Sequence, residues 1–107
     1  MASFESQYME NQQTMQIVLG PSFGHEQWGE LQAFYGAQCE TPELRLWVID
    51  MRQVTFLNSM LLGLLVGFNA VVSSRGQEFR LLVTKGSKPA EILYFAKLNR
   101  IINIREA

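Results

Sequence analysis

The sequence predicts an α/β fold, a mixed and mostly parallel sheet of about five strands with helices packed on it. Strand-like and helix-like segments alternate along most of the chain, which is typical of parallel strands joined by helices. Two short segments around a polar turn open the chain as an antiparallel hairpin, which makes the sheet mixed. The length of 107 residues is that of one domain, so we expect residues 1–107 to form a single domain.

The first half of the chain supplies the hairpin, a helix and the central strand. We expect the hairpin at 3–8 and 14–19, because strand-like residues flank the polar segment 10–13. Gly20-Pro21 ends the second strand, and apolar residues then recur at steps of three and four, which predicts a helix from about His25 to Gln38. Pro42 breaks the chain again before 44–51, whose dense apolar middle is typical of a central strand covered on both faces.

The second half repeats the alternation. Asn58 or Ser59 can cap a helix over 59–74, because either side chain can accept a hydrogen bond from the first turn. Gly76 is the expected end of this helix, and a strand should follow at 79–84. Ser87 can cap a helix over 89–98 with Pro89 in its first turn, and 101–104 is the last predicted strand.

A helical wheel divides the 59–74 segment into three stripes. The broad apolar stripe predicts ordinary core and contains Leu61, Leu64, Leu65, Phe68, Val71 and Val72. A stripe of small residues permits close approach by the sheet or by a partner, and contains Gly63, Gly67, Ala70 and Ser74. Leu62 and Val66 fall on the side that should face water, so their apolar character needs an explanation.

Composition excludes several classes of function. Nine Lys and Arg against ten Asp and Glu give a net charge of -1, which argues against nucleic acid as a partner. The single Cys39 fits a reducing compartment, and the N-terminal segment lacks the apolar run of a secretion signal, so we expect a cytoplasmic protein. No charged residue occurs between Arg52 and Arg75, but polar residues and glycines interrupt this run, which argues against a membrane span.

Catalytic and metal-binding patterns do not emerge from the sequence. His25 is the only histidine and Cys39 the only cysteine, so neither a nucleophile with its base nor a metal site is indicated. The glycine-containing segments match neither phosphate-binding fingerprint, so we expect no cofactor and no enzymatic activity. Asp50 ends the predicted central strand, where its expected role is pairing with Arg52 or with a loop amide.

Two segments resemble the STAS domain, the family of bacterial anti-sigma factor antagonists and of domains attached to sulfate transporters. They are Val48-Ile49-Asp50-Met51 and Val54-Thr55-Phe56-Leu57-Asn58-Ser59-Met60-Leu61-Leu62-Gly63. The segments 18–20 and 92–102 extend the likeness over most of the chain. The resemblance implies a sheet with helices mainly on one side and a regulatory protein partner. In the best-known branch this partner is a kinase-like anti-sigma factor, which phosphorylates the second hydroxyl residue of an Asp-Ser-Ser/Thr-Gly turn.

The chain departs from this motif at the residues that matter most. Asn58 replaces the acidic residue, Ser59 matches the first serine, Met60 occupies the phosphoacceptor position and Leu61 replaces the glycine. Methionine cannot accept phosphate, so the hypothesis is a non-enzymatic domain that binds its protein partner constitutively. The proposed contact residues make a neutral, largely apolar patch. They are Asn58, Ser59, Met60, Leu61, Leu62, Gly63 and Val66.

The sequence is also compatible with other hypotheses about function. Met60 and Leu62 could bury in their own core, leaving a degenerate relative with a different functional surface. The domain could instead be a subunit of a transport complex, such as phospholipid-trafficking machinery, or a small-molecule-binding STAS domain. Phosphorylation at Ser59 is a third alternative, and a homodimer is compatible with the sequence.

Overall fold

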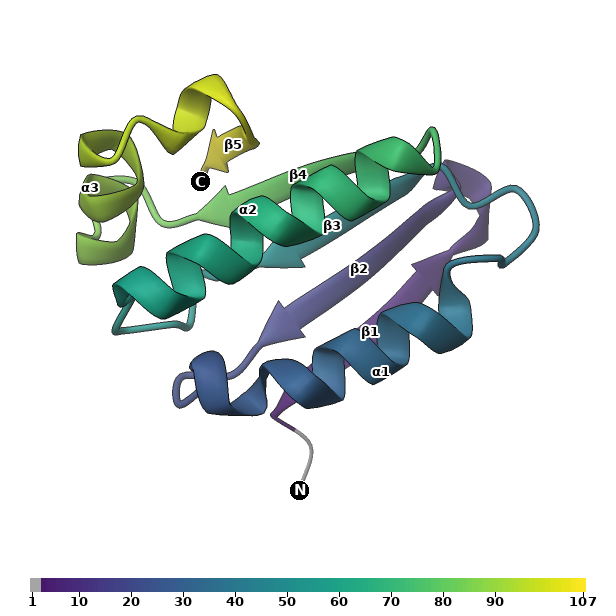
Figure 1. Ribbon diagram of the computed structural model, residues 1–107, viewed down its shortest axis with the longest axis horizontal. Coiled ribbons are helices and arrows are strands. Elements are labelled where there is room, and N and C mark those ends of the chain that lie inside the picture. The colour runs from purple at the N-terminus through teal and green to yellow at the C-terminus, as the bar shows by residue number, and fades with distance from the viewer. Residues whose placement is uncertain (1–2) are drawn as a thin grey trace.

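The computed structural model describes residues 3–107, which form one five-stranded mixed sheet in the order β1-β2-β3-β4-β5 (Figure 1). The strands are β1 (Phe4–Met9), β2 (Thr14–Leu19), β3 (Leu46–Asp50), β4 (Glu78–Val83) and β5 (Asn103–Glu106). β1 pairs with β2 antiparallel, and every other neighbouring pair is parallel. The predicted mixed, mostly parallel sheet with 44–51 at its centre is therefore confirmed.

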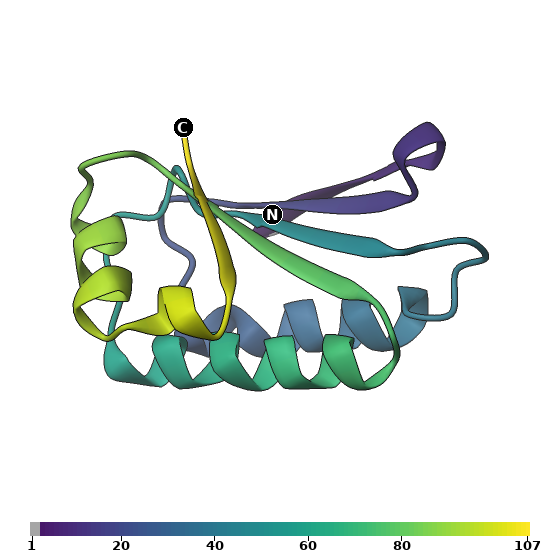
Figure 2. The same ribbon diagram turned by 90° about the horizontal axis from the view of Figure 1, so that it is seen from above.

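All the helices that follow β2 lie on one face of this sheet (Figure 2). The α-helices are α1 (Trp28–Gln38), α2 (Ser59–Ser74) and α3 (Lys88–Phe95), and the short 3-10 turns are η1 (Glu10–Gln12), η2 (His25–Gln27) and η3 (Leu98–Arg100). α1 and α2 run side by side beneath the strands, and α3 lies at the end of the sheet near the start of α2. The prediction of helices mainly on one side is confirmed.

The core lies between the sheet and these helices. The strand register places Ile17, Ile49 and Leu81 opposite one another on neighbouring strands, and all three are fully buried. Phe68 of α2 lies at the centre of an aromatic cluster, with its ring centroid 5.1 Å from that of Tyr35 and 5.1 Å from that of Phe79. Helix α2 is therefore fixed over the middle of the sheet, which also fixes where its first turn lies.

Local signals set the element ends as the sequence predicts. Asn58 caps α2, and Ser87 caps α3 by accepting a 3.3 Å hydrogen bond from the Ala90 backbone N–H. Gly76 follows α2 with φ +75°, a left-handed conformation that favours glycine. Cys39 is buried and free, so it packs as a small core residue.

The predicted helix at 25–38 and the predicted strand at 101–104 need correction. Residues 25–27 form the 3-10 turn η2, and the regular helix begins only at Trp28. Lys97 adopts φ 60° after α3, and the chain then turns through η3 before β5 starts at Asn103. Ile102 is buried inside this turn, so its apolar character reflects core packing and not a strand.

The predicted coverage of the central strand on both faces is wrong. Trp47 and Ile49 of β3 are buried under the helices, whereas Leu46 and Val48 point to the opposite face and are only half-buried. Because every helix after β2 lies on one side, the described residues leave this second face open (Figure 2).

The helical wheel predicts six core residues in α2, and four of them are buried. Leu61, Leu65, Phe68 and Val72 are buried, Leu64 is half-buried, and the Val71 side chain is 47% exposed. The expected exposure of Leu62 and Val66 is wrong, because both are half-buried and pack against the core. The small-residue stripe faces outward and not toward the sheet, since a Cβ added at Gly63 or Gly67 would meet no atom within 4 Å.

A second neighbour lies along one side of α2. Asn69, one turn beyond Val66, donates a 3.3 Å hydrogen bond to the carbonyl of Ile101. The side of α2 that carries Val66 and Asn69 therefore packs against the segment around η3 as well as against the sheet. Within residues 3–107, no helix combines the length and the apolar content that crossing a bilayer requires.

Candidate functional site

The site lies where the parallel strands end. The carboxyl ends of β2, β3 and β4 meet at one edge of the sheet and are followed by the loops 20–24, 51–58 and 84–87. This edge is where open α/β sheets usually place functional groups, because the loops there diverge to helices and leave a crevice. The loop before α2 is the one that resembles the STAS motif.

Apolar anchors hold the turn before α2 in place. Val54 and Leu57 are buried, and the turn is tightened by a 3.0 Å hydrogen bond from the Val54 N–H to the Met51 carbonyl. Between these anchors Phe56 points outward with 70% of its surface exposed. Met60, in the first turn of α2, is 59% exposed. The protein therefore displays two large apolar side chains on a turn that is itself well anchored.

Asn58 connects this turn to the loop after β2. Its Oδ1 accepts a 2.8 Å hydrogen bond from the Leu61 backbone N–H, which satisfies one of the free donors at the start of α2. Its Nδ2 lies 3.1 Å from Nδ1 of His25. Because the cap fixes the amide orientation, Nδ2 donates and the His25 Nδ1 accepts, which assigns the proton of the neutral ring to Nε2.

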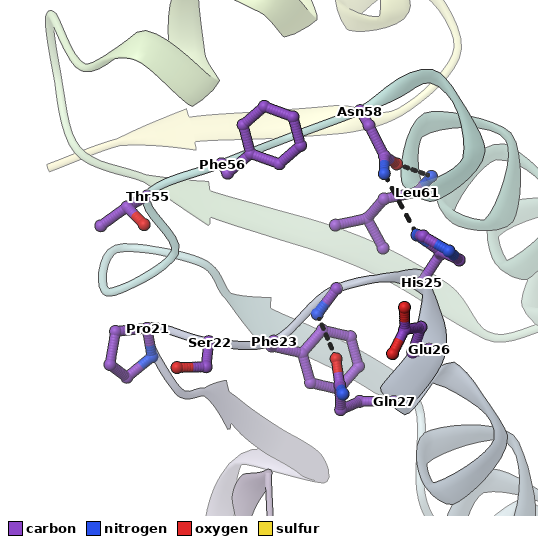
Figure 3. A pocket seen from close by; sticks show the side chains of 11 residues that line it. Pro21, Ser22, Phe23, His25, Glu26, Gln27, Thr55, Phe56, Asn58 and Leu61 are labelled. Carbon is purple, nitrogen blue, oxygen red and sulfur yellow. Dashed lines mark hydrogen bonds between the residues drawn. The ribbon is translucent and has the colours of Figure 1, made fainter.

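A cavity of about 480 Å³ separates the two loops (Figure 3). One wall comes from residues 21–27 and the other from Thr55, Phe56, Asn58 and Leu61. The Gln27 side chain accepts a 2.8 Å hydrogen bond from the Gly24 backbone N–H, so it stabilises its own loop. The hydrogen bond between His25 and Asn58 therefore joins the two walls, whereas Gln27 stiffens only the first.

Asp50 has a structural role at the base of the site. Its buried carboxylate accepts a 2.9 Å hydrogen bond from the Arg52 backbone N–H. It also forms a 2.9 Å ion pair with the Arg52 guanidinium. The hydrogen bond and the charge of Asp50 raise the pKa of Arg52 above its usual value, so the arginine stays charged. The predicted pairing of Asp50 with Arg52 and a loop amide is confirmed, and it stiffens the exit from β3.

The structure divides the predicted site residues into three groups. Asn58, Ser59, Met60 and Gly63 lie at the surface or partly so, on the first turns of α2. Leu62 and Val66 are half-buried against the core. Leu61 is a correction, because its side chain is 1% exposed and belongs to the core beneath the turn, so it cannot contact a partner.

Two features of the site escaped sequence reasoning. Phe56 sits between the apolar residues Val54 and Leu57, and nothing in the sequence alone says which of the three faces water. His25 joins Asn58 across 33 positions, which depends on the parallel pairing of β2 with β3. Parallel pairing was itself predicted, so proximity of the 20–27 and 51–58 loops could have been inferred, though not the hydrogen bond.

Comparison with known proteins defines the fold and no more. No family model and no curated protein matches the chain. Among solved structures, the NMR structure of the protein TM1081 is similar, with a TM-score of 0.79 and 17% sequence identity. The match covers 97% of this chain and 81% of that chain. At this identity the similarity supports the α/β architecture over nearly its whole length.

Proposed function

We propose that this protein is a non-enzymatic regulatory domain of the STAS type that binds a partner protein constitutively through the turn before α2. The exposure of Phe56 and Met60 on either side of the Asn58 cap is the observation that carries the proposal. The proposal also keeps the expected cytoplasmic location.

The energetics of the exposed pair favour an interface. Fully burying a side chain of the size of Phe or Met is worth about 1.5–3 kcal/mol, so two such residues can form the centre of a protein–protein contact. The turn is already ordered by the buried Val54 and Leu57 and by the Asn58 cap. Binding would therefore cost little conformational entropy of the backbone.

The chemistry of the cavity favours binding over catalysis. His25 accepts from Asn58 and Gln27 accepts from Gly24, so both side chains already serve to join or stiffen the loops. Asp50, the buried carboxylate at this edge, is engaged by Arg52. These polar groups are therefore committed to structure, which supports a protein-binding role.

The departure from the STAS motif at Met60 supports a contact that phosphorylation does not control. Met60 occupies the position that carries the phosphate-accepting hydroxyl in the family, and the residue is exposed where a kinase would act. An apolar side chain at this place favours a contact that phosphorylation does not switch. The neighbouring Ser59 is exposed at the first helical position, so phosphorylation there is the competing proposal.

Met60→Asp tests the proposal without threatening the fold. Met60 lies in the first turn of α2, where a carboxylate interacts favourably with the helix dipole, so stability should stay equal or rise by about 0.3–1 kcal/mol. A charge in the centre of an apolar contact should abolish partner capture from native cells. Val71→Asp is the matched control, because Val71 is also exposed on α2 but lies about 16 Å further along the helix axis. If a folded Met60→Asp protein still captures the partner, the proposal is wrong.

The identity of the captured protein separates the two regulatory settings. A kinase-like anti-sigma factor would place the domain in sigma regulation. A transporter subunit would support the alternative of a STAS subunit in a transport complex, for which an unswitched apolar contact is equally suitable. Co-purified lipid without any protein would instead favour the small-molecule-binding alternative.

A further inference from the structure

The sulfur-containing side chains of this chain differ sharply in exposure. Three of those in residues 3–107 are buried, namely Met15, Cys39 and Met51. Met9 is half-buried at the end of β1. Met60 is 59% exposed and lies outside the hydrophobic core cluster that the described residues form. Within residues 3–107, Met60 is therefore the most accessible sulfur-containing side chain.

Accessibility decides which methionine a peroxide oxidises. The thioether sulfur attacks one oxygen of hydrogen peroxide, the O–O bond breaks, and a sulfur–oxygen bond forms. The departing hydroxide takes the hydrogen of the transferred oxygen and leaves as water, so the sulfur loses the two electrons that the peroxide gains. The product, methionine sulfoxide, is polar, and methionine sulfoxide reductases return it to methionine with electrons from thiols.

Met60 lies where a change of polarity has a large effect on the proposed contact. With Phe56 it forms the exposed apolar pair on either side of the Asn58 cap. Burial of apolar surface is what this pair contributes to partner binding. A sulfoxide oxygen that is buried without a hydrogen-bond donor opposes that burial. The contact therefore depends on the side chain at position 60 remaining apolar.

The fold tolerates an oxidised side chain at this position. The turn is anchored by the buried Leu57 and Leu61 and by the Asn58 cap, none of which depends on the Met60 side chain. Oxidation of a buried methionine such as Met15 would instead place a polar group in the core. Modification of Met60 therefore changes the surface and leaves the fold intact, as a regulatory site requires.

We propose that Met60 is a site of reversible oxidation by peroxide, and that its sulfoxide releases the partner protein. This regulation rests on the proposed function, because it acts on the same contact. Binding is constitutive while the thioether is reduced, and oxidation interrupts it. Phosphorylation requires a hydroxyl group that position 60 lacks, whereas oxidation uses the sulfur that is present there.

Oxidation of the purified full chain tests the site itself. Dilute hydrogen peroxide is added, and peptide mass spectrometry follows the gain of one oxygen at each methionine with time. Met60 should oxidise about tenfold faster than Met15 and Met51, because the reaction follows exposure. Circular dichroism should show that protein oxidised at Met60 alone stays folded. Equal rates at Met60 and at the two buried methionines, or unfolding of this singly oxidised protein, would overturn the proposal.

Capture from a native-cell lysate tests the consequence. The peroxide-treated wild type should retain the protein captured by the reduced wild type at least about tenfold less, and treatment with a methionine sulfoxide reductase and dithiothreitol should restore capture. Met60→Leu keeps an apolar side chain of similar volume, so it should capture the same protein and lose the sensitivity to peroxide. Met9→Leu is the matched control, because loss of this half-buried methionine should leave the sensitivity unchanged.

Met60→Asp separates the failure of this switch from the failure of the proposed function. If folded Met60→Asp still captures the partner, the contact lies elsewhere and both are wrong. If Met60→Asp loses the partner but protein oxidised at Met60 retains it, only the oxidation switch is wrong. A Met60→Leu protein whose capture is still lost on peroxide treatment would place the responsive residue elsewhere, and it would also overturn the switch.

Discussion

Replacing Asn58 by Ala removes two hydrogen bonds that organise the site. Loss of the cap to the Leu61 N–H should cost about 1 kcal/mol, the usual effect of such a change at a helix start. Loss of the 3.1 Å bond to His25 should cost a further 0.5–1 kcal/mol or so, toward the low end for a partly exposed pair. We therefore expect the free energy of unfolding to fall by roughly 1.5–2 kcal/mol.

Urea denaturation at pH 7 measures this loss, and two further variants separate its parts. His25→Ala keeps the cap and should cost only about 0.5–1 kcal/mol. Asn58→Asp keeps an acceptor for the Leu61 N–H but loses the donor to the His25 Nδ1. The negative charge that it places at the helix start offsets this loss, so its stability should stay within about 0.5 kcal/mol of the wild type. The reasoning fails if Asn58→Ala is as stable as the wild type, or if Asn58→Asp is as unstable as Asn58→Ala.

Three other substitutions test the packing. Gly76→Ala should cost about 1–2 kcal/mol, because φ +75° is strained for alanine, whereas Gly63→Ala should gain up to about 1 kcal/mol, because the added Cβ meets no atom and alanine favours helix. Equal effects of the two changes in urea denaturation would contradict this. Tyr35→Phe should be neutral or stabilising at pH 7, since the buried Tyr35 hydroxyl has no hydrogen-bond partner among residues 3–107, and a clear loss of stability would reveal a missed contact. Burial raises the pKa of Tyr35 above its ordinary 10.0, so the wild type should lose stability as pH rises through 10 and beyond, and Tyr35→Phe should lose less between pH 9 and pH 11.

Local chemistry made most of the fold predictable. Pro42, Gly76 and Ser87 mark breaks and caps whose physical cause is contained in a few neighbouring residues. The last strand was misplaced because Ile101 and Ile102 look strand-like in isolation. Their conformation is set instead by the left-handed Lys97 and by the core beneath η3, and neither is visible in the local sequence.

Tertiary contacts explain what the helical wheel missed. A wheel assumes one apolar face and one neighbour, whereas α2 packs against both the sheet and the segment around η3. Leu62 and Val66 pack against the core, and the orientation of the helix leaves Val71 at the edge of the groove between α1 and α2. These assignments depend on how the C-terminal segment folds back, which periodicity cannot reveal.

The exposure of the predicted site residues could be inferred from the sequence only in part. The motif resemblance and the cap placed attention on Asn58, Ser59 and Met60, and the structure displays Met60 at the surface. Leu61 was grouped with them by sequence adjacency, yet the helix turns it into the core. The contribution of Phe56 emerged only from the folded turn, because its neighbours on both sides compete for the same core.

Photo-cross-linking in native cells tests the central claim most directly. Phe56 is 70% exposed, so a photoreactive phenylalanine analogue at position 56 can reach a bound partner. It should form a covalent adduct with one specific protein. We predict that this adduct persists when Val71→Asp is added and disappears when Met60→Asp is added, while the domain stays folded. An adduct that survives Met60→Asp, or the absence of any protein adduct at position 56, would contradict constitutive partner binding through this turn.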